Sequence, residues 1–214
     1  DKKTMEKLLK RLQAGDDIAL ISDAGTPLIS DPGYRIVAEA RKRDITVAPI
    51  PGACAAIAAL SVSGLPTDSF YFGGFLPVKS GQRKTALSAL KSSTNTLVFY
   101  EAPHRILETV EDLLDVFGGQ RQAFMGREIS KAFETFLQGD LTQLRQQIAE
   151  DSNQQRGEIV LVIAGTDEKA ETSAVDPEMV LKLLLKELPT SKAASLTAKI
   201  CGLDKKAVYQ AALR

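Results

Sequence analysis

The sequence predicts an α/β protein with two α/β lobes and a C-terminal helical tail. Short apolar segments typical of strands alternate with helical patterns through the first 166 residues. A segment rich in Pro, Lys, Ser and Gly, residues 77–82, interrupts this alternation and marks a linker. Beyond residue 176 only helical patterns follow. We therefore expect lobes at residues 1–76 and 77–166, and a tail at residues 176–214.

The first lobe begins with a helix, because apolar residues recur at helical spacing over Met5–Leu12. A second helix begins at Asp31-Pro32, where an acidic cap precedes a proline at the first helical position. A third, Ala53–Ser63, is rich in small residues. The strands expected in this lobe are the short apolar segments Ile18–Ile21, Ile45–Ile50 and Phe70–Phe75.

The second lobe continues the same alternation, and the tail lacks it. The helices expected in the second lobe are Lys84–Lys91, Arg105–Phe117 and Leu141–Ala149. Its expected strands are Thr96–Tyr100, Gln122–Gly126, Glu134–Gln138 and Glu158–Ala164. Pro189 and Gly202 separate the three helices of the tail, which are Pro177–Leu188, Ser191–Cys201 and Lys205–Leu213.

Composition narrows the class of protein. Lys+Arg and Asp+Glu both number 27, so any nucleic-acid-binding surface has to be a local basic patch. The two cysteines, Cys54 and Cys201, are far apart, which predicts no disulfide framework and no metal site. No apolar segment approaches the roughly 20 residues that span a bilayer, and we expect no signal peptide. We expect a cytoplasmic protein without a membrane segment or a metal.

The first candidate ligand loop is Ser22–Gly33, which follows a predicted strand and precedes a predicted helix. Ligand loops of α/β proteins lie at such strand ends. Gly25 permits close backbone approach, and Asp23 and Thr26 offer polar groups. The loop lacks the G-x-G-x-x-G and G-x-x-x-x-G-K-[ST] patterns, which disfavours a dinucleotide or P-loop triphosphate site. An ordinary glycine turn remains an equal alternative.

The second candidate loop is Ile50–Ala55, followed by the small-residue helix. A flat adenine and a ribose fit against such a wall of small side chains. Tight packing of the helix on a sheet explains the same residues equally well. Cys54 is interpreted as a small packed side chain rather than a nucleophile.

Six motifs in order decide between these alternatives: SDAGTPLISDPGY, IPGACAAIAALSVSGLP, GGFLP, LVFYEAPHR, GREISKAFE and GEIVLVIAG. Together they resemble the tetrapyrrole methylase superfamily, and within it the members that methylate bacterial 16S ribosomal RNA. The resemblance covers nearly the whole chain, including the tail. It implies an S-adenosylmethionine-dependent homodimer that methylates the ribose 2'-hydroxyl of a cytidine in the small ribosomal subunit, with the cofactor between the lobes.

The resemblance also implies positions for the cofactor. The Gly-Thr-Pro turn corresponds to a Gly-Asp-Pro turn whose backbone holds the cofactor in this superfamily. The Pro-Gly loop, the end of the strand at Tyr100 and, more weakly, the last strands supply further positions. With Asp23, the expected cofactor-binding residues are Ala24, Gly25, Thr26, Ile29, Cys54, Ala55, Glu101 and Met125, with Val160 as a weaker addition.

The sequence departs from the superfamily pattern at its start. The pattern opens with a strand and a Pro-x-Gly-Asn loop and continues with a Glu-Asp-Thr-Arg segment, and neither stands in these 214 residues. The chain also begins at Asp1 inside a helical pattern. We expect the first lobe to be N-terminally incomplete, and this chain by itself to be catalytically impaired.

A ribose hydroxyl is a poor nucleophile and benefits from a general base or a hydrogen-bond acceptor. The candidates for this catalytic role are Glu101, His104, Glu128 and Lys131. His104 is equally typical of a solvated residue near the start of a helix. Lys131 can act as a base only where its pKa falls strongly.

RNA contacts require cations for the phosphate backbone. Lys79, Arg83 and Lys84 cluster in and beside the linker, and Arg105 and Arg127 have the planar fork that suits phosphate. Pairing of these arginines with Glu101 or Glu128, and a solvated lysine cluster, are the alternatives. The tail supplies Lys192, Lys199, Lys205, Lys206 and Arg214.

Two other functions fit the sequence. A methylase of the same fold acting on a tetrapyrrole requires a wide apolar trough, which the basic linker does not favour. A non-catalytic nucleic-acid-binding protein could use the helix-Gly-helix pattern of the tail. The first would transfer methyl groups to a porphyrin or corrin, and the second would lose all function with the tail.

Overall fold

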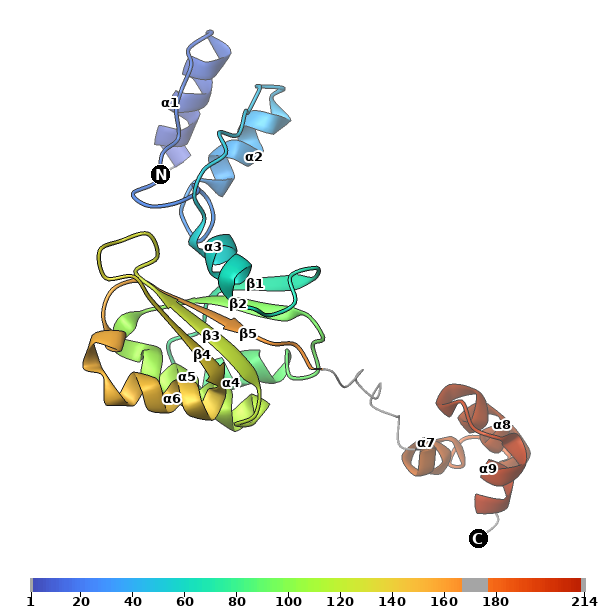
Figure 1. Ribbon diagram of the computed structural model, residues 1–214. Coiled ribbons are helices and arrows are strands. Elements are labelled where there is room, and N and C mark those ends of the chain that lie inside the picture. The colour runs from blue at the N-terminus through green and yellow to red at the C-terminus, as the bar shows by residue number, and fades with distance from the viewer. Residues whose placement is uncertain (1, 167–176, 213–214) are drawn as a thin grey trace. The chain divides into compact units, whose positions relative to one another are not determined.

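Figure 1 shows the protein as a computed structural model, which describes residues 2–166 and 177–212. The chain divides into two compact units, Asp1–Thr166 and Asp167–Arg214. Every strand that the structure describes belongs to the first unit. Within the described ranges, the helices are too short or too polar for any of them to cross a bilayer.

The first unit is built on a five-stranded mixed sheet in the order β1-β2-β5-β3-β4. β1 runs parallel to β2, and the other neighbouring strands are antiparallel. β2 and β5 lie inside the sheet and are buried on both faces, which is why their sequences are nearly continuous apolar runs. The strands are β1 (Phe70–Phe75), β2 (Thr96–Glu101), β3 (Gln122–Arg127), β4 (Thr135–Asp140) and β5 (Ile159–Ile163).

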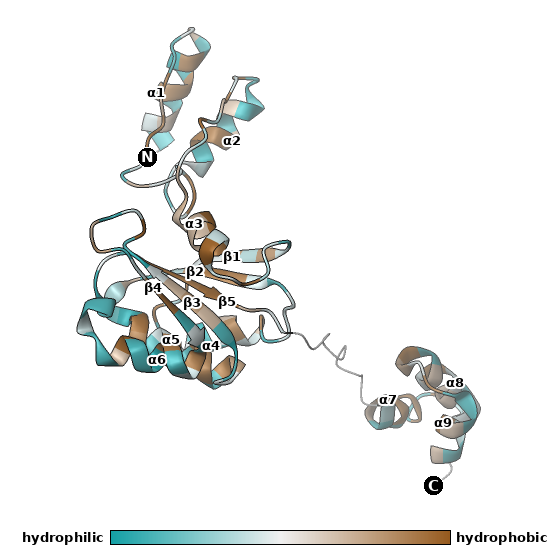
Figure 2. Cartoon of the chain, in the orientation of Figure 1, coloured by the Kyte–Doolittle hydropathy of each residue, from teal (hydrophilic) through white to brown (hydrophobic). Residues whose placement is uncertain are grey.

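Helices cover both faces of this sheet (Figure 1). α4 (Ser80–Ser88), α5 (Ile106–Phe117) and α6 (Leu141–Glu150) lie on one face, and α3 (Ala55–Val62) lies on the other. Figure 2 shows the apolar colouring concentrated in α3 and the inner strands, with polar residues on the outer side of α6. Two 3-10 turns, Pro103–Arg105 and Ser152–Gln155, lie against each other at one end of the sheet. The sheet is therefore the middle layer of a three-layer unit.

β1 joins the two parts that the sequence assigns to separate lobes. Its bounds are those predicted, but it pairs with β2 of the second predicted lobe, from Phe70 opposite Thr96 to Phe75 opposite Tyr100. α4 begins at Ser80, inside the segment predicted to be a linker. A division at residue 76 therefore separates two neighbouring strands of one sheet, and the two-lobe division remains a proposal.

The N-terminal part differs most from prediction. Its helices are α1 (Lys2–Gln13) and α2 (Tyr34–Lys42), and α2 begins at Tyr34 because Gly33 precedes it with a φ of 133°. The predicted strands Ile18–Ile21 and Ile45–Ile50 are wrong for this structure, since neither segment forms a strand. A strand needs a neighbour for its backbone hydrogen bonds, and none of the described residues pairs with these segments.

The second unit is a small helical bundle that agrees with the predicted tail. α7 (Pro177–Leu184), α8 (Thr190–Cys201) and α9 (Lys205–Ala211) pack through buried alanines of α8 and Val208 of α9. Gly202 ends α8 in the left-handed conformation, as the sequence predicts. The Asp204 carboxylate then caps α9 by accepting hydrogen bonds from the backbone N–H groups of Lys206 and Ala207.

Candidate functional site

The two predicted ligand loops contact each other. The Thr26 hydroxyl donates a hydrogen bond to the carbonyl oxygen of Ala53 over 3.0 Å. Gly25 adopts a left-handed conformation with a φ of 70°, and an added Cβ would lie 3.5 Å from the same oxygen. The Ser22 hydroxyl closes the first loop on itself by bonding the Asp31 carboxylate. The loops thus converge at the start of α3.

Tyr100 fixes the second loop to the sheet. Its phenol oxygen accepts a hydrogen bond from the backbone N–H of Ala56 over 3.3 Å and lies 3.9 Å from the Cys54 sulfur. Cys54 makes no side-chain bond to the start of α3, so the phenol takes the place of the usual cap. Burial, together with Cys54, raises the pKa of Tyr100 from 10.0 to about 12, so the phenol stays protonated at neutral pH. The sequence marks this strand end, but no local pattern reveals the bond to α3.

The surface beside the loops is both apolar and polar. The side chains of Ile21 and Ile50 are 86% and 89% exposed, which is unusual for isoleucine. Asp23, Ala24 and Gly25 are exposed next to them. Ile29 is 40% exposed, whereas Cys54 and Ala55 are half-buried. A ligand with an apolar ring and polar substituents would cover these isoleucines and meet the loop backbone.

A hollow of about 790 Å³ lies next to the first loop. It is bounded by Asp31, Pro32 and Gly33 on one side and by residues of α1, including Met5 and Leu8, on the other. α1 therefore borders the segment that carries the first predicted loop.

The structure keeps the Met125 side chain away from the loops, whereas Val160 lies in the core cluster against which Cys54 and Ala55 of the second loop pack. The Met125 side chain is fully buried in the core between the sheet and α4, α5 and α6. This is the face opposite to Cys54 and Tyr100, which pack with α3. Val160 is 3% exposed and faces α3 from within the core. Alternation along β3 turns the Met125 side chain into the helical core, and a cofactor contact at Met125 stays a prediction.

Glu101 is a buried structural residue. Its oxygens accept hydrogen bonds from Arg105 over 2.5 Å, from the backbone N–H of Ala102 over 2.6 Å and from the Thr109 hydroxyl over 2.6 Å. Its side chain is 0% exposed. Three donors engage both oxygens of this carboxylate, which favours a structural role for Glu101, and its catalytic role stays a prediction. The alternative from the sequence, a pair with Arg105, is the one observed.

Glu128 and Lys131 also hold each other. The backbone N–H of Glu158 donates to Glu128 over 2.8 Å and, together with Lys131 at 3.0 Å, lowers the pKa of Glu128. The hydrogen bonds to Glu128 and Glu158 raise the pKa of Lys131. Lys131 therefore remains a cation and is not a base. A Cβ at Gly157 would overlap the Glu128 carboxylate at 2.5 Å, so glycine is needed for this arrangement.

His104 lies exposed in the turn Pro103–Arg105. The side chains of Glu101, Glu128 and Lys131 are held by hydrogen bonds and ion pairs, and no such bond to the His104 side chain is found among the described residues. It is the candidate whose side chain remains available to a substrate.

Most of the predicted RNA-binding cations are engaged within the protein. Arg83 is 0% exposed and bonds Asp112 over 2.6 Å, and Lys84 pairs with Asp115 over 2.6 Å, which raises the pKa of Lys84. Arg105 pairs with Glu101, and Arg127 is 7% exposed and bonds the Thr135 hydroxyl over 2.9 Å. Lys79 is exposed. In this structure Arg83, Arg105 and Arg127 are bonded within the protein, which spacing along a sequence does not show, and their phosphate contacts stay predictions.

Comparison with known sequences decides the family. The profile of the Tetrapyrrole (Corrin/Porphyrin) Methylases matches residues 1–145, and that of the RsmI C-terminal HTH domain matches residues 171–214. The Ribosomal RNA small subunit methyltransferase I of Pseudomonas aeruginosa is 52% identical over 210 residues, which cover 97% of this chain and 74% of that protein. This chain belongs to the ribosomal RNA small subunit methyltransferase I family. The member from Escherichia coli O157:H7 is 47% identical over 208 residues, covering 97% of this chain and 73% of its own.

Solved structures confirm the fold of this methyltransferase I family member. The methyltransferase CobJ matches with a TM-score of 0.56 at 14% identity, over 76% of this chain and 70% of its own. A uroporphyrin-III-C-methyltransferase from Thermus thermophilus matches with a TM-score of 0.53 at 20% identity, over the same 76% and 70%. The predicted tetrapyrrole methylase fold with a helical tail is confirmed, and the protein is a methyltransferase.

Proposed function

We propose that this protein transfers the methyl group of S-adenosylmethionine to the ribose 2'-hydroxyl of a cytidine in 16S ribosomal RNA of the small subunit. The observation that carries this proposal is the identity of 52% to a Ribosomal RNA small subunit methyltransferase I over 97% of the chain. The ribose position and the base come from the six ordered motifs and their resemblance to this branch of the superfamily.

The residues of the two loops suit a nucleoside cofactor. S-adenosylmethionine, when bound, supplies a methyl group on a positively charged sulfur. The exposed backbone of Ala24 and Gly25 permits close approach, and the Asp23 carboxylate favours a cation nearby. The exposed Ile21 and Ile50 would exclude water from an apolar ring. The chain's contribution is to bind and orient, because positioning alone can supply roughly 7–11 kcal/mol of barrier reduction.

His104 is the proposed acceptor for the proton of the ribose hydroxyl. Glu101, Glu128 and Lys131 are held in bonds within the protein, whereas the imidazole of His104 is exposed. Replacement of His104 by Gln should lower kcat without changing cofactor affinity.

The main experiment measures cofactor binding and the modified nucleoside. Isothermal titration calorimetry with S-adenosylmethionine on this chain should give binding, and its absence would overturn the proposal. The protein is then incubated with radiolabelled S-adenosylmethionine and with small ribosomal subunits that lack the 2'-O-methyl group. The RNA is digested to nucleosides afterwards. We expect 2'-O-methylcytidine. A methylated base, or transfer to a porphyrin or corrin and not to the subunits, would contradict the proposed substrate.

We further propose that the protein works as a homodimer, as the resemblance implies. Large apolar side chains are exposed on and beside α3 and β1, including Ile57 at 50%, Val62 at 54%, Phe75 at 56% and Val78 at 73%. Such exposure is typical of surfaces that a partner covers. Analytical ultracentrifugation should show a dimer, and a monomer at micromolar concentration would contradict this part of the proposal.

A further inference from the structure

α1 carries a local excess of positive charge in a chain whose net charge is zero. Its 12 residues include one acidic residue, Glu6, and five basic ones: Lys2, Lys3, Lys7, Lys10 and Arg11. The Glu6 carboxylate is engaged by Arg43 of α2 over 2.7 Å, which lowers the pKa of Glu6. The one acidic residue of α1 is therefore already paired with a cation outside the helix.

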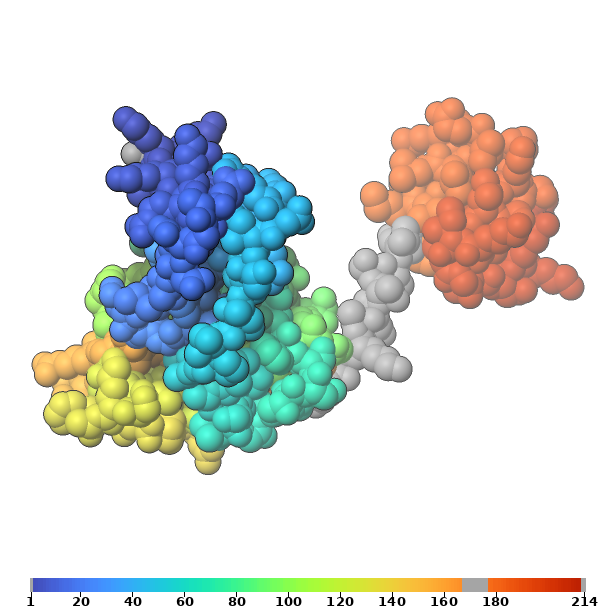
Figure 3. Space-filling model, turned by 90° about the horizontal axis from the view of Figure 1, so that it is seen from above, coloured from blue at the N-terminus to red at the C-terminus, as the bar shows by residue number. Residues whose placement is uncertain are grey.

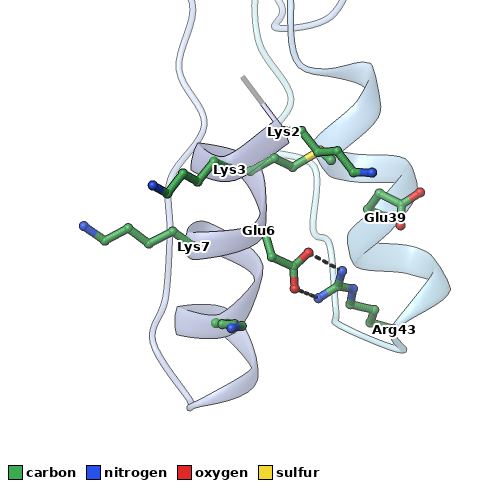
Figure 4. Close-up of a pocket in the computed structure, with 8 residues that line it drawn as sticks. Lys2, Lys3, Glu6, Lys7, Glu39 and Arg43 are labelled. Carbon is green, nitrogen blue, oxygen red and sulfur yellow. Dashed lines mark hydrogen bonds and ion pairs between the residues drawn. The ribbon is translucent and has the colours of Figure 1, made fainter.

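Three of these cations share one face of the helix. At 3.6 residues per turn, Lys3, Lys7 and Lys10 lie within about 60° of one another around the axis and span about 10 Å along it. All three are exposed, and Figure 4 shows Lys3 and Lys7 directed to the same side, away from α2. We call these three residues the α1 lysine face. The buried side of α1 is centred on Leu9.

Like charges lie next to one another on the α1 lysine face. Lys3 and Lys7, four residues apart, and Lys7 and Lys10, three apart, place like charges next to each other. The first turn has no acidic residue, although the helix dipole favours one there. An anionic partner on this face would remove the repulsion.

α1 also lies close to the proposed cofactor site. The hollow of about 790 Å³ between α1 and Asp31–Gly33 separates it from the loop that ends there. A second hollow, of about 1070 Å³, lies between α1 and α2 and is lined by Lys2, Glu39 and Arg43 among others (Figure 4). In the space-filling view, the N-terminal segment stands out at the surface beside the segment that contains α2 (Figure 3).

We propose that the α1 lysine face binds the phosphate backbone of the RNA substrate. This inference rests on the proposed function, which requires a polyanion to reach the loops. Three of the cations predicted to bind RNA, Arg83, Arg105 and Arg127, are bonded within the protein, which leaves exposed lysines such as those of α1 to meet the RNA. Lysine ammonium groups contact phosphate as point charges and carry no sequence preference, so the face positions the RNA.

The test is a salt titration of RNA binding. The affinity of the full chain for a fragment of 16S ribosomal RNA is measured by fluorescence anisotropy at several salt concentrations, for the wild type and for the triple variant K3Q/K7Q/K10Q. Each lost phosphate contact reduces the slope of log affinity against log salt by about 0.7–0.9. We expect the magnitude of this slope to fall by about 2–3 in the triple variant. We also expect its RNA affinity at low salt to fall by at least about tenfold.

Two variants separate this surface from charge in general. K3R/K7R/K10R keeps the three charges and should keep the slope. K91Q/R156Q/K186Q removes three exposed cations from other elements, gives the same net charge as the glutamine variant, and should change the slope by well under half as much. An unchanged slope in K3Q/K7Q/K10Q, or an equal loss in the second control, would overturn the inference. Binding of the wild type to vesicles of anionic lipid through this face, and not to RNA, would also overturn it.

Parallel calorimetry with S-adenosylmethionine distinguishes the two proposals. If the wild type binds the cofactor but the salt slope of RNA binding is the same in wild type and K3Q/K7Q/K10Q, this inference alone is contradicted. Wild type that binds RNA through α1 but neither binds the cofactor nor methylates RNA contradicts the proposed function alone.

Discussion

Neighbouring residues of one strand serve opposite sides of the protein. Tyr100 and Glu101 are consecutive in β2, so their side chains point to opposite faces of the sheet. Tyr100 bonds the start of α3 beside the candidate site, whereas Glu101 bonds Arg105 and Thr109 beneath it. The two residues thus attach the loop layer and the helix layer to the same point of the sheet.

Replacing Glu101 by Gln should destabilise the protein, because it leaves the guanidinium of Arg105, which is 11% exposed, without its anion. Breaking a buried pair in this way costs about 3–5 kcal/mol of unfolding free energy. Urea unfolding measures this loss. The control is E111Q, which breaks an exposed pair with Arg145 and should cost less than about 1 kcal/mol. Normal stability with a strongly reduced kcat would instead make Glu101 the base.

Tyr100→Phe removes one hydroxyl and should cost about 1 kcal/mol at neutral pH, because the Ala56 N–H loses its acceptor. Folding raises the pKa of this phenol from 10.0 to about 12, so in this range the folded state holds a proton that the unfolded chain releases. The contribution is full below pH 10 and is lost as pH rises through about 12. Denaturation at several alkaline pH values should show a steeper decline for wild type than for Y100F. Parallel curves would contradict this account.

Gly25→Ala should weaken binding of S-adenosylmethionine, because a Cβ on the exposed backbone of Gly25 would occupy the space through which the cofactor is proposed to approach. Gly64→Ala is a matched control, since Gly64 has a φ of 71° against 70° for Gly25 but no atom within 4 Å of its added Cβ. Both variants should lose about 1–2 kcal/mol of unfolding free energy, because alanine is strained in the left-handed backbone conformation. Calorimetry should show weaker binding of S-adenosylmethionine in G25A alone. An equal loss of affinity in both variants would contradict a role of Gly25 in cofactor binding.

Among the elements, α4 and α5 are joined by a buried ionic cluster. Arg83 bonds Asp112 through its Nε and the Val78 carbonyl through its Nη1, at 2.6 and 3.1 Å. The Ser80 hydroxyl and Lys84 approach the other oxygen of Asp112 at 2.8 and 3.4 Å. The cluster fixes the start of α4, immediately after the turn that leaves β1.

Arg83→Met keeps the length of the side chain but leaves Asp112 without its buried cation. We expect a loss of about 3 kcal/mol in unfolding free energy, with no change in RNA affinity at temperatures where the variant is folded. Lys84→Met removes a half-exposed cation from the same cluster and should cost less than about 1 kcal/mol. A specific loss of RNA affinity in R83M with unchanged stability would restore the predicted phosphate contact.

The sequence predicts those elements whose signals are local. β1 has the predicted bounds, β2, β3 and β5 lie within a residue of theirs, and the Gly202 turn is where expected, because apolar runs and turn residues act over a few positions. The expected strands at residues 18–21 and 45–50 have the same local pattern. These two predictions are wrong because a strand needs a neighbouring strand, which can be distant in sequence. No described residue forms such a neighbour for either segment.

The candidate site shows the same division. The two loops follow from glycine, proline and their place between elements, and they do meet at Ala53. The roles of Glu101, Arg83 and Arg127 do not follow, because burial and pairing are properties of the folded chain. A buried arginine and a phosphate-binding arginine are identical in sequence, and only their surroundings distinguish them.

At the scale of the whole molecule, a net charge of zero conceals an uneven distribution. Arg83 and Lys84 of α4 are paired with acidic residues of α5, whereas α1 and the tail present exposed lysines. The described residues 177–212 contain six lysines and three acidic residues, a balance of +3. Electrostatic attraction to a polyanion therefore depends on these surfaces and is sensitive to salt.

The division into two compact units predicts independent folding. A chain that ends at Thr166 should fold and bind S-adenosylmethionine with an affinity within about threefold of the full chain, since both candidate loops lie in the first unit. Circular dichroism and calorimetry measure these properties. Loss of cofactor binding on removal of the tail, with the sheet intact, would support the alternative in which function centres on the tail.

The bond between Tyr100 and Ala56 has a practical consequence, because it makes one amide a natural reporter. The Ala56 amide hydrogen exchanges with solvent deuterium only when its hydrogen bond to the Tyr100 phenol breaks. Breaking this bond requires the loop to open away from the sheet. Its exchange rate, followed by NMR as a ligand is titrated, would report binding at the two loops without the methyl-transfer reaction.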